Sequence, residues 1–326
     1  MSEAKLILGI DTSNYTTSAA LCTLDGEVVL NLKKLLAVAE GERGLRQSDA
    51  LFAHTKNLPS IMEELNRYLD EQYPARNIVA VGYSATPRDV EGSYMPCFLS
   101  GVAVASSIAA AVGCPAYRFS HQSGHVMAAL YSADKLDLLE RKERFAAFHV
   151  SGGTTELLLI TPNEGGFCIE QIGGTADINA GQAIDRTGVL MGMRFPCGRQ
   201  MEESLADTNI PHAKTRISVK GLQCNLSGLE NLARAIYEKS GDVAQTSAYC
   251  FDFVADTLAR MTENLREQYT DIPVIYAGGV MSNQRIKERL KQFENTYFSA
   301  PVFSSDNAAG TALLCRDRYL KSKKET

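Results

Sequence analysis

Two histidines one helical turn apart are the clearest candidates for chemistry in this chain. His121 and His125 occupy positions i and i+4 of a His-Gln-Ser-Gly-His segment. On a helix this spacing puts both imidazoles on one face, with Cβ atoms about 5–6 Å apart, and two such rings can ligate one metal ion. A pair of surface or capping histidines is the alternative interpretation. A third histidine of the five in the chain, His149, directly precedes a glycine-rich turn.

A further metal ligand would have to come from a distant part of the chain. Asp306 is the candidate, because it follows an extended run over residues 297–303 and precedes a helix predicted over 308–320. A carboxylate at the start of a helix is equally typical of an N-cap. The hypothesis is a metal site of His121, His125 and Asp306, with a plain cap as the alternative for the aspartate.

A different chemistry is indicated by Ser151-Gly152-Gly153-Thr154-Thr155, which separates two apolar runs, residues 145–150 and 157–160. This pattern predicts a strand, a tight turn and a second strand. Adjacent glycines at a strand tip let the backbone approach a ligand, and hydroxyls beside free amides suit phosphate oxygens. An ordinary hairpin turn is the alternative.

The same arrangement occurs near the N-terminus. An apolar run over residues 5–10 ends in Asp11-Thr12-Ser13, and two more predicted strands follow, the second over 27–32; the central turn is likewise followed by a third strand, over 167–172. Two such hairpins facing each other across a cleft would hold the phosphates of a nucleotide between them, as in the actin, sugar-kinase and Hsp70 superfamily. We therefore predict an α/β fold of two actin-like, RNase H-like lobes with nucleotide and metal in the cleft between them.

The composition excludes several classes of protein. No apolar run approaches the ~20 residues of a membrane span, and Glu3, Lys5 and Asp11 make the N-terminal segment unlike a signal peptide. The eight cysteines include no Cys-x-x-Cys pair, which favours a reduced, cytoplasmic protein over a disulfide framework. The net charge is −5, so a nucleic-acid partner would need a local basic patch.

The remaining pattern predicts the elements that position these residues. Helices are expected over 50–73, 98–112, 179–191, 247–269 and 284–293, with Pro59 kinking or splitting the first, and strands over 78–83, 115–119 and 273–277. The first lobe would comprise residues 1–119 and 307–326, the second residues 120–306. Gly278-Gly279 and Asn283 stand at a strand-to-helix junction where an adenine could lie against the backbone, although a simple turn is equally consistent.

Taken in order, these motifs resemble one family, the universal tRNA N6-threonylcarbamoyladenosine synthases, formerly labelled glycoproteases. The resemblance covers essentially the whole chain. It rests on Gly9-Ile10-Asp11-Thr12-Ser13, His121-Gln122-Ser123-Gly124-His125, Val150-Ser151-Gly152-Gly153, Ala183-Ile184-Asp185, Pro196-Cys197-Gly198, Ser227-Gly228-Leu229, Gly278-Gly279-Val280 with Asn283, and Asp306-Asn307-Ala308-Ala309.

The resemblance implies transfer of a threonylcarbamoyl group from threonylcarbamoyl-AMP to N6 of the adenosine 3′ of the tRNA anticodon. It implies one iron or zinc ion on the two histidines and Asp306, and catalytic roles for Asp11 and Ser13. It implies partners as well: tRNA, the enzyme that forms threonylcarbamoyl-AMP, small accessory subunits, and a homo- or heterodimer, with no membrane. The positions implied to hold ATP or threonylcarbamoyl-AMP are Thr12, His149, Val150, Ser151, Gly152, Gly153, Asp185, Gly198, Gly278, Gly279 and Asn283.

The chain also departs from the family pattern at functional positions. Asn14-Tyr15-Thr16 replaces the usual Cys-Asp-Glu-Thr, and Thr86-Pro87-Arg88 replaces a Gly-Pro-Gly loop. Ser123 and Gln182 stand in place of two motif glutamates, and Glu230 stands in place of a lysine. Two alternative functions follow from these changes. One is a catalytically lapsed paralog that binds nucleotide and metal and acts as a regulatory subunit. The other is a carbamoyltransferase with a small-molecule acceptor.

Overall fold

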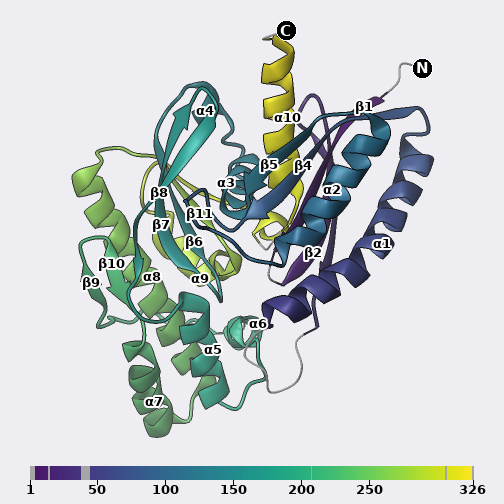
Figure 1. The fold of residues 1–326 in the computed structure, drawn as a ribbon. Coiled ribbons are helices and arrows are strands. Elements are labelled where there is room, and N and C mark those ends of the chain that lie inside the picture. The colour runs from purple at the N-terminus through teal and green to yellow at the C-terminus, as the bar shows by residue number, and fades with distance from the viewer. Residues whose placement is uncertain (1–3, 14, 38–44, 207, 305–306, 325–326) are drawn as a thin grey trace. The chain divides into compact units, whose positions relative to one another are not determined.

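The computed structural model describes residues 4–13, 15–37, 45–206, 208–304 and 307–324 (Figure 1). The contacts divide the chain into two compact units. Unit 1 contains residues 1–136, 163–167 and 305–326, and unit 2 contains residues 137–162 and 168–304.

Unit 1 is built on a five-stranded sheet in the order β3-β2-β1-β4-β5. The strands β1 (Ala4–Ser13), β2 (Thr16–Thr23) and β3 (Val28–Leu35) form an antiparallel meander. The strands β4 (Arg76–Thr86) and β5 (Ala116–Ser120) then add in parallel to β1. Three parallel strands therefore end at the same edge of this sheet.

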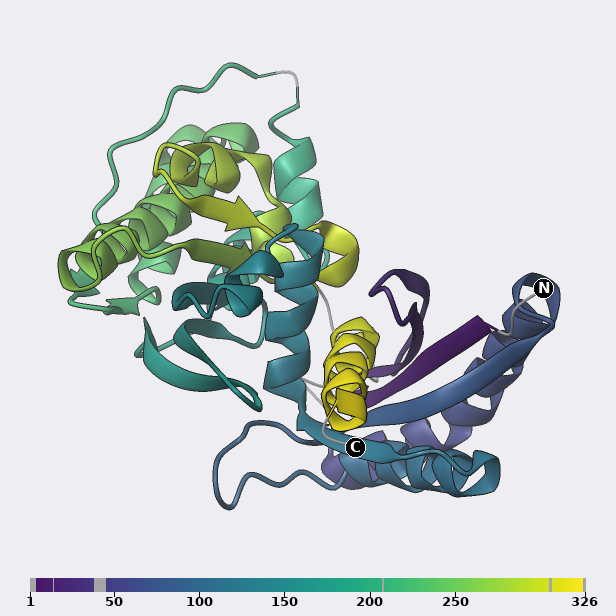
Figure 2. The same cartoon turned by 90° about the horizontal axis from the view of Figure 1, so that it is seen from above.

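Helices cover both faces of that sheet. The helices α1 (Gln47–Gln72) and α2 (Phe98–Val112) lie on one side and α10 (Ala309–Lys324) on the other (Figures 1 and 2). Two glycines show how closely the helices approach: a Cβ on Gly9 of β1 would lie 2.6 Å from backbone atoms of Ala308 and Ala312, and one on Gly101 of α2 would lie 2.7 Å from Thr12 Oγ1. Any larger side chain at either position would separate the helix from the sheet.

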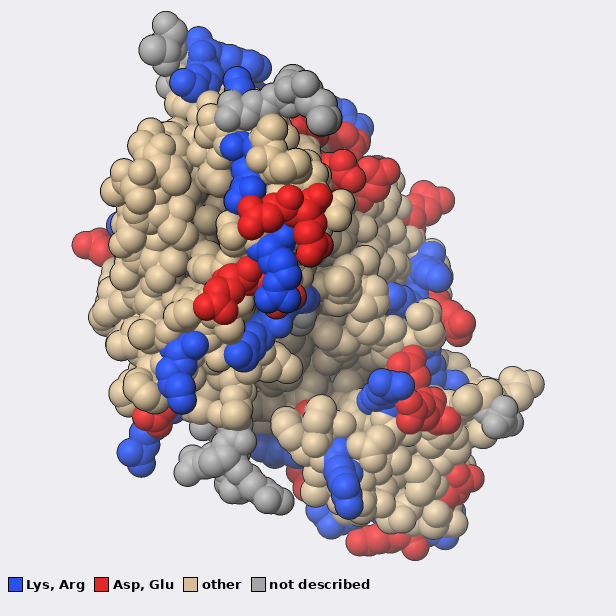
Figure 3. Space-filling view, turned by 90° about the vertical axis from the view of Figure 1, so that its right-hand side faces the viewer, with Lys and Arg blue, Asp and Glu red and all other residues tan. Residues whose placement is uncertain are grey.

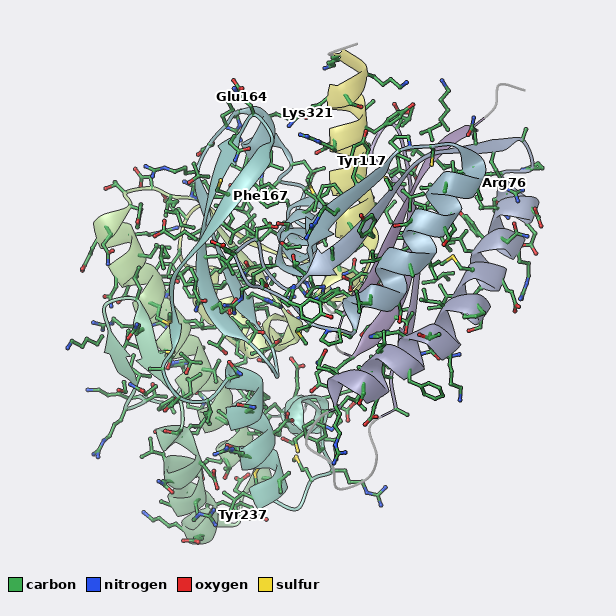
Figure 4. The ribbon with its side chains drawn as sticks, viewed as in Figure 1. Arg76, Tyr117, Glu164, Phe167, Tyr237 and Lys321 are labelled. Carbon is green, nitrogen blue, oxygen red and sulfur yellow. The ribbon has the colours of Figure 1, made fainter. Side chains whose placement is uncertain are left out.

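The helix α3 (His121–Ser132) follows β5 directly and packs on α10, which places it in unit 1. The sequence-based boundary at residue 120 therefore precedes the division of contacts, which falls after Leu136. Residues 163–167 also group with unit 1, because Lys321 Nζ of α10 donates to the Glu164 carbonyl at 3.1 Å (Figure 4). Tyr117 of β5 is tied to the same helix, its hydroxyl lying 3.2 Å from Ser322 Oγ.

Unit 2 has a seven-stranded sheet in the order β12-β11-β6-β7-β8-β10-β9. Its strands are β6 (Phe145–Val150), β7 (Thr155–Asn163), β8 (Gly166–Thr175), β9 (Ser218–Lys220), β10 (Gln223–Asn225), β11 (Val274–Ala277) and β12 (Thr296–Phe298). Its α-helices are α4 (Asp137–Glu140), α5 (Ala180–Leu190), α6 (Gly198–Glu203), α7 (Gly228–Ser240), α8 (Val243–Gln268) and α9 (Gln284–Leu290). Two 3₁₀ helices, Gly279–Ser282 and Pro301–Phe303, complete it.

An aromatic stack holds three neighbouring strands of unit 2 together. The rings of Phe148, Tyr276 and Phe298 lie on β6, β11 and β12, with successive centroids 5.1 and 5.2 Å apart. Tyr276 is fully buried, and its hydroxyl lies 2.5 Å from Thr262 Oγ1 of α8. Burial raises the pKa of this phenol, so it stays neutral and fixes the long helix to the sheet.

Most predicted elements are present, with two informative differences. The helix α1 begins at Gln47 and continues through Pro59 without a break, because Leu58, Ile61 and Leu65 bury one face against the sheet and offset the missing backbone hydrogen bond. Residues 218–225 form the short strands β9 and β10, which are not among the elements expected from the sequence. Among the described residues, no helix combines the length and apolar character that crossing a membrane requires.

Candidate metal and nucleotide sites

The candidate residues of unit 1 lie where its parallel strands end, at one edge of the sheet. Asp11 lies near the carboxyl end of β1, Thr86 ends β4, and Ser120 ends β5 immediately before His121. Thr86 is paired with Ser120 in the β4–β5 register. Ligands of open α/β sheets bind outside the carboxyl ends of such strands, so this edge is the expected place for a site.

Asp11, His121 and His125 form a chain of polar contacts at that edge. The Nδ1 atom of His121 lies 3.0 Å from Asp11 Oδ1, and its Nε2 lies 2.9 Å from His125 Nε2. Asp11 is completely buried, whereas the His121 side chain is 19% exposed. A carboxylate on one imidazole nitrogen fixes the ring and leaves the other nitrogen facing a ligand, which is the usual outer support of a metal-binding histidine.

The predicted convergence of the two histidines is therefore present. Asp306, their proposed partner, lies outside the described residues. Among the residues that are described, no group of three or more His, Cys, Asp or Glu side chains is arranged to hold a metal ion. The sequence interpretation assigned Asp11 to catalysis and missed its contact with His121. The available signal was the order of the parallel strands, which places the ends of β1 and β5 at one edge.

The hydroxyl-rich turn after Asp11 is largely buried in unit 1. Thr12 Oγ1 donates to the Cys97 carbonyl at 3.1 Å and accepts from the Gly101 amide at 3.2 Å, so this hydroxyl anchors α2. The Ser13 amide donates to Asp11 Oδ2 at 3.3 Å. Ser13 Oγ is buried without a hydrogen bond to any described residue, which leaves it available to a ligand. The catalytic role of Ser13 stays a prediction.

His54 is a buried histidine beside this turn that the sequence interpretation did not select. Its Nδ1 lies 2.8 Å from Thr17 Oγ1, and the ring is fully buried. Burial lowers the pKa of His54, against the opposing effects of the Asp11 carboxylate and the Ser13 carbonyl, so the neutral ring is favoured. Its position on α1, packed under the turn, had no distinctive sequence pattern.

In unit 2 the Ser151-Gly152-Gly153 turn joins β6 to β7, as predicted. Ser151 Oγ accepts from the amides of Gly153 at 3.2 Å and Thr154 at 3.1 Å, so these amides point into the turn. A Cβ on either glycine of the turn would meet no atom within 4 Å. The turn is thus open on the side where a ligand would approach.

Two close backbone approaches fix this turn in place. Gly181, in the first turn of α5, has its Cα so near Gly152 that a Cβ would lie 2.6 Å from the Gly152 Cα, and its amide donates to the Ser151 carbonyl at 3.1 Å. Gly278 has φ +101°, and a Cβ there would lie 2.2 Å from the Val150 carbonyl oxygen. The N-terminus of α5 and the β11 junction therefore both converge on the turn.

The remaining nucleotide candidates surround the same region of unit 2. Asp185 Oδ1 accepts from the Cys197 amide at 2.7 Å, which holds α5 beside Gly198 at the start of α6. Burial raises the pKa of Asp185, opposed by that amide. Asn283 caps α9, its Oδ1 accepting from Ile286 N at 3.0 Å, while its buried Nδ2 donates to no described residue. Gly279 starts a 3₁₀ helix next to Gly278.

His149 is the penultimate residue of β6, paired with Ala277 and Glu156 on the neighbouring strands. It therefore lies at the base of the Ser151 turn in unit 2. Its role in ligand binding stays a prediction.

Three of the replaced family positions have structural partners instead. Ser123 Oγ donates to Asp89 Oδ2 at 2.6 Å at the start of α3. Gln182 Oε1 accepts from the Asn179 amide at 3.1 Å and completes a capping box for α5. Glu230 pairs with Arg234 at 3.1 Å on the surface of α7. These side chains now stabilise helix termini and surfaces.

Two α/β units with mixed sheets, one of them a meander followed by parallel strands, define the actin-like ATPase fold class. Solved structures agree on the fold. Component A of (R)-2-hydroxyglutaryl-CoA dehydratase from Acidaminococcus fermentans is 14% identical to this chain, with a TM-score of 0.53. The match covers 97% of this chain and 100% of that chain. Full-length HypF in its phosphate- and nucleotide-bound form is 13% identical, with a TM-score of 0.59. The match covers 98% of this chain and 46% of that chain.

The sequence comparisons are more specific. A family model described as tRNA N6-adenosine threonylcarbamoyltransferase matches residues 34–313, and the chain belongs to that family. The enzyme of that name from Streptococcus suis (strain 05ZYH33) is 29% identical over 333 residues, 98% of this chain and 94% of its own. The enzyme of the same name from Streptococcus pneumoniae (strain Taiwan19F-14) is 28% identical over 297 residues, which are 88% of this chain and 83% of its own. The expected fold class and family are confirmed, and the protein is a transferase.

Proposed function

We propose that the chain transfers a threonylcarbamoyl group from threonylcarbamoyl-AMP to N6 of the adenosine 3′ of the tRNA anticodon. The observation that supports this most directly is the chain of contacts from buried Asp11 through His121 to His125. A fully buried carboxylate aimed at one imidazole suits the support of a bound cation, because isolated buried charge is costly.

The two histidines at this edge are proposed to hold one divalent ion, iron or zinc. His121 and His125 present their Nε2 atoms to each other, and Asp11 supports the outer nitrogen of His121. Asp306 is proposed as the third ligand. When bound, the ion would polarise phosphate or carbamoyl oxygens as a Lewis acid. Asp11 would orient the His121 ring and hold its Nδ1 proton, so that Nε2 keeps its lone pair for the ion.

Unit 2 would bind the adenylate with its own residues. The Ser151 turn, which is open beside Gly152 and Gly153, would receive the phosphate oxygens. Asp185 would accept hydrogen bonds from ribose hydroxyls, and the unpartnered Nδ2 of Asn283 would donate to the nucleotide. Gly278, which has no side chain, lets the Val150 backbone approach closely and so holds the turn that would receive the phosphate. These groups position the adenylate, which is where most of the rate enhancement of a group transfer can arise.

Reconstitution tests the proposal directly. The purified chain would be incubated with threonine, bicarbonate, ATP, an active adenylate-forming enzyme, the small accessory subunits and an unmodified tRNA transcript. Digestion and mass spectrometry of the nucleosides should show threonylcarbamoyladenosine, and His125→Ala should abolish it. A transcript lacking the target adenosine is the matched substrate control. Absence of the nucleoside, while the adenylate demonstrably accumulates, would contradict the proposal.

A regulatory subunit that binds nucleotide and metal is the second candidate. It is favoured by the structural use of Gln182, Ser123 and Glu230, where the family pattern has chemically active side chains. Titration with ATP and then with tRNA separates the candidates. Nucleotide affinity without tRNA affinity favours the subunit, and tRNA affinity with product formation favours the transferase. Size-exclusion chromatography with the adenylate-forming enzyme would report the homo- or heterodimer expected in either case.

A further inference from the structure

A pocket of about 310 Å³ lies in unit 1 beside the histidine pair and has no role in the proposed chemistry. It is at the carboxyl ends of β4 and β5, where Thr86 and Ser120 are paired one residue before His121. Its lining combines two arginines with apolar and polar side chains from both strand ends: Thr86, Arg88, Asp89, Val90, Arg118 and Phe119.

The wall of this pocket is held in place by hydrogen bonds within unit 1. Asp89 Oδ2 accepts from Ser120 Oγ at 2.8 Å and from Ser123 Oγ at 2.6 Å, which attaches the loop to the start of α3. The Arg88 amide donates to Ser93 Oγ at 3.0 Å. A loop fixed at these points loses little further conformational freedom when a ligand binds, and this favours affinity.

The charges of the pocket favour an oxyanion. Within the part of the chain that the structure describes, the exposed side chain of Arg118 makes no ion pair or hydrogen bond. Arg88 stands where the family pattern has a glycine and brings a second guanidinium to the same pocket. Guanidinium groups match phosphate oxygens with paired donors. The Asp89 carboxylate is already engaged by the two serine hydroxyls.

A local pocket matters because the chain lacks a favourable overall charge. The net charge is −5, and on the face shown in Figure 3 acidic and basic side chains alternate instead of forming one basic area. An anionic polymer would therefore be bound through individual contacts at sites such as this pocket, and not through a broad basic surface.

We propose that this pocket binds a phosphate group and, resting on the proposed function, that the phosphate belongs to the backbone of the tRNA acceptor. Backbone contacts of this kind fix the orientation of a nucleic acid without reading its sequence. Held beside β4 and β5, the RNA strand would be oriented relative to the His121 edge. Val90 and Phe119 supply an apolar wall against which a ribose could pack.

The test is the salt dependence of tRNA binding. Arg118→Ala, Arg88→Ala and the double variant would be titrated with tRNA between about 50 and 200 mM salt. Each lost contact should make the slope of log K against log salt shallower by about 0.7–0.9. Arg118→Lys should keep most of the slope. Arg260→Ala, an exposed arginine of α8 paired with Glu263, is the control and should bind as wild type does. Wild-type affinity and slope in the double variant would overturn the proposal.

Inorganic phosphate separates this inference from the proposed function. Phosphate should raise the melting temperature of the wild type above that in chloride at equal ionic strength, because it binds the folded state. The double variant should show a smaller increment, because the Ser151 turn of unit 2 can still bind phosphate, whereas Arg260→Ala should retain the full increment. If the wild type fails to bind tRNA yet shows the arginine-dependent increment, the proposed function fails and the phosphate pocket stands. An equal response to phosphate in wild type and double variant refutes the pocket.

Discussion

The carboxylate of Asp11 lies 3.0 Å from Nδ1 of His121, a residue 110 positions further along the chain. The contact exists because β1 and β5 are both parallel to β4 and end at one edge of the sheet. It makes Asp11 a support for the histidine pair and not only a member of the hydroxyl-rich turn.

Asp11→Asn should therefore weaken metal binding without removing a ligand. The amide keeps the size of the side chain but lacks the charge that fixes the His121 ring, and losses of about 10–100-fold in affinity are typical of such supporting residues. Competition with a chelator, followed by measurement of bound iron and zinc, would quantify the change. Asp49→Asn, an exposed aspartate in the first turn of α1, is the matched control. Equal metal retention in both variants would remove Asp11 from the site.

His125→Ala should strip the metal while leaving the fold intact. Its Nε2 faces that of His121 at 2.9 Å, so its removal takes away a proposed ligand. The comparison is His212→Ala, because that histidine contacts Asp252 and Asp256 in unit 2 and should affect stability but not metal content. Elemental analysis and a circular-dichroism melt report the two properties separately. Stoichiometric metal in folded His125→Ala would disprove the assignment.

Asp185→Ala should weaken nucleotide binding by about 1.5–3 kcal/mol, the typical worth of a hydrogen bond to a charged group. The same change removes the acceptor of the Cys197 amide, so part of the loss would come from displaced α6. Asp185→Asn keeps an acceptor for that amide and isolates the contribution of the charge. Calorimetric titration with ATP measures both variants. An affinity equal to that of the wild type would place Asp185 outside the nucleotide site.

Asp177 should make the stability of the protein depend on pH in the acid range. Partial burial alone would raise the pKa of this carboxyl, but hydrogen bonds from Leu226 N, from the hydroxyl and amide of Ser227 and from Ile178 N outweigh it and hold the pKa at about 2, below the ordinary value of 3.8. Because the folded-state pKa is depressed, the stabilisation is complete above pH 3.8 and is lost as pH falls towards 2.

The comparison of wild type with Asp177→Asn by urea unfolding isolates this effect. The wild type should be more stable near neutral pH, and the difference should shrink below about pH 4 as the carboxyl becomes protonated. Asp134→Asn, at an exposed turn, is the control substitution for the loss of one negative charge. A difference that stays constant down to pH 2 would mean that the carboxylate charge does not hold the start of α7.

The sequence predicted what depends on local pattern. The periodic strands and helices, the His121–His125 face and the Ser151 turn all follow from residue spacing over a few positions. The contact of Asp11 with His121 and the burial of His54 depend on strand order and helix packing, which no local pattern specifies. Continuous α1 shows the same limit, because tertiary burial outweighed the local effect of Pro59.

The two glycines that follow β11 offer a sharp test of how the Ser151 turn is positioned. Gly278 has φ +101°, where a side chain is strained, and a Cβ would lie 2.2 Å from the Val150 carbonyl oxygen. Gly279 has no neighbouring atom within 4 Å of its Cβ position. Gly278→Ala should therefore cost roughly 2–4 kcal/mol, the range for backbone strain combined with overpacking, and Gly279→Ala less than about 1 kcal/mol.

The nucleotide affinity of the turn should also fall more in Gly278→Ala than in Gly279→Ala. Backbone movement at Val150 would displace Ser151, which is the next residue, so Gly278→Ala should lose nucleotide affinity even under conditions where it remains folded. Gly279→Ala should leave the turn in place, so its nucleotide affinity should fall less than that of Gly278→Ala. Chemical unfolding and ATP titration of both variants measure the two effects. Equal stability of the two alanine variants would show that the close contact of Gly278 with Val150 does not position the turn. The contact of α5 with the turn would then be what holds it.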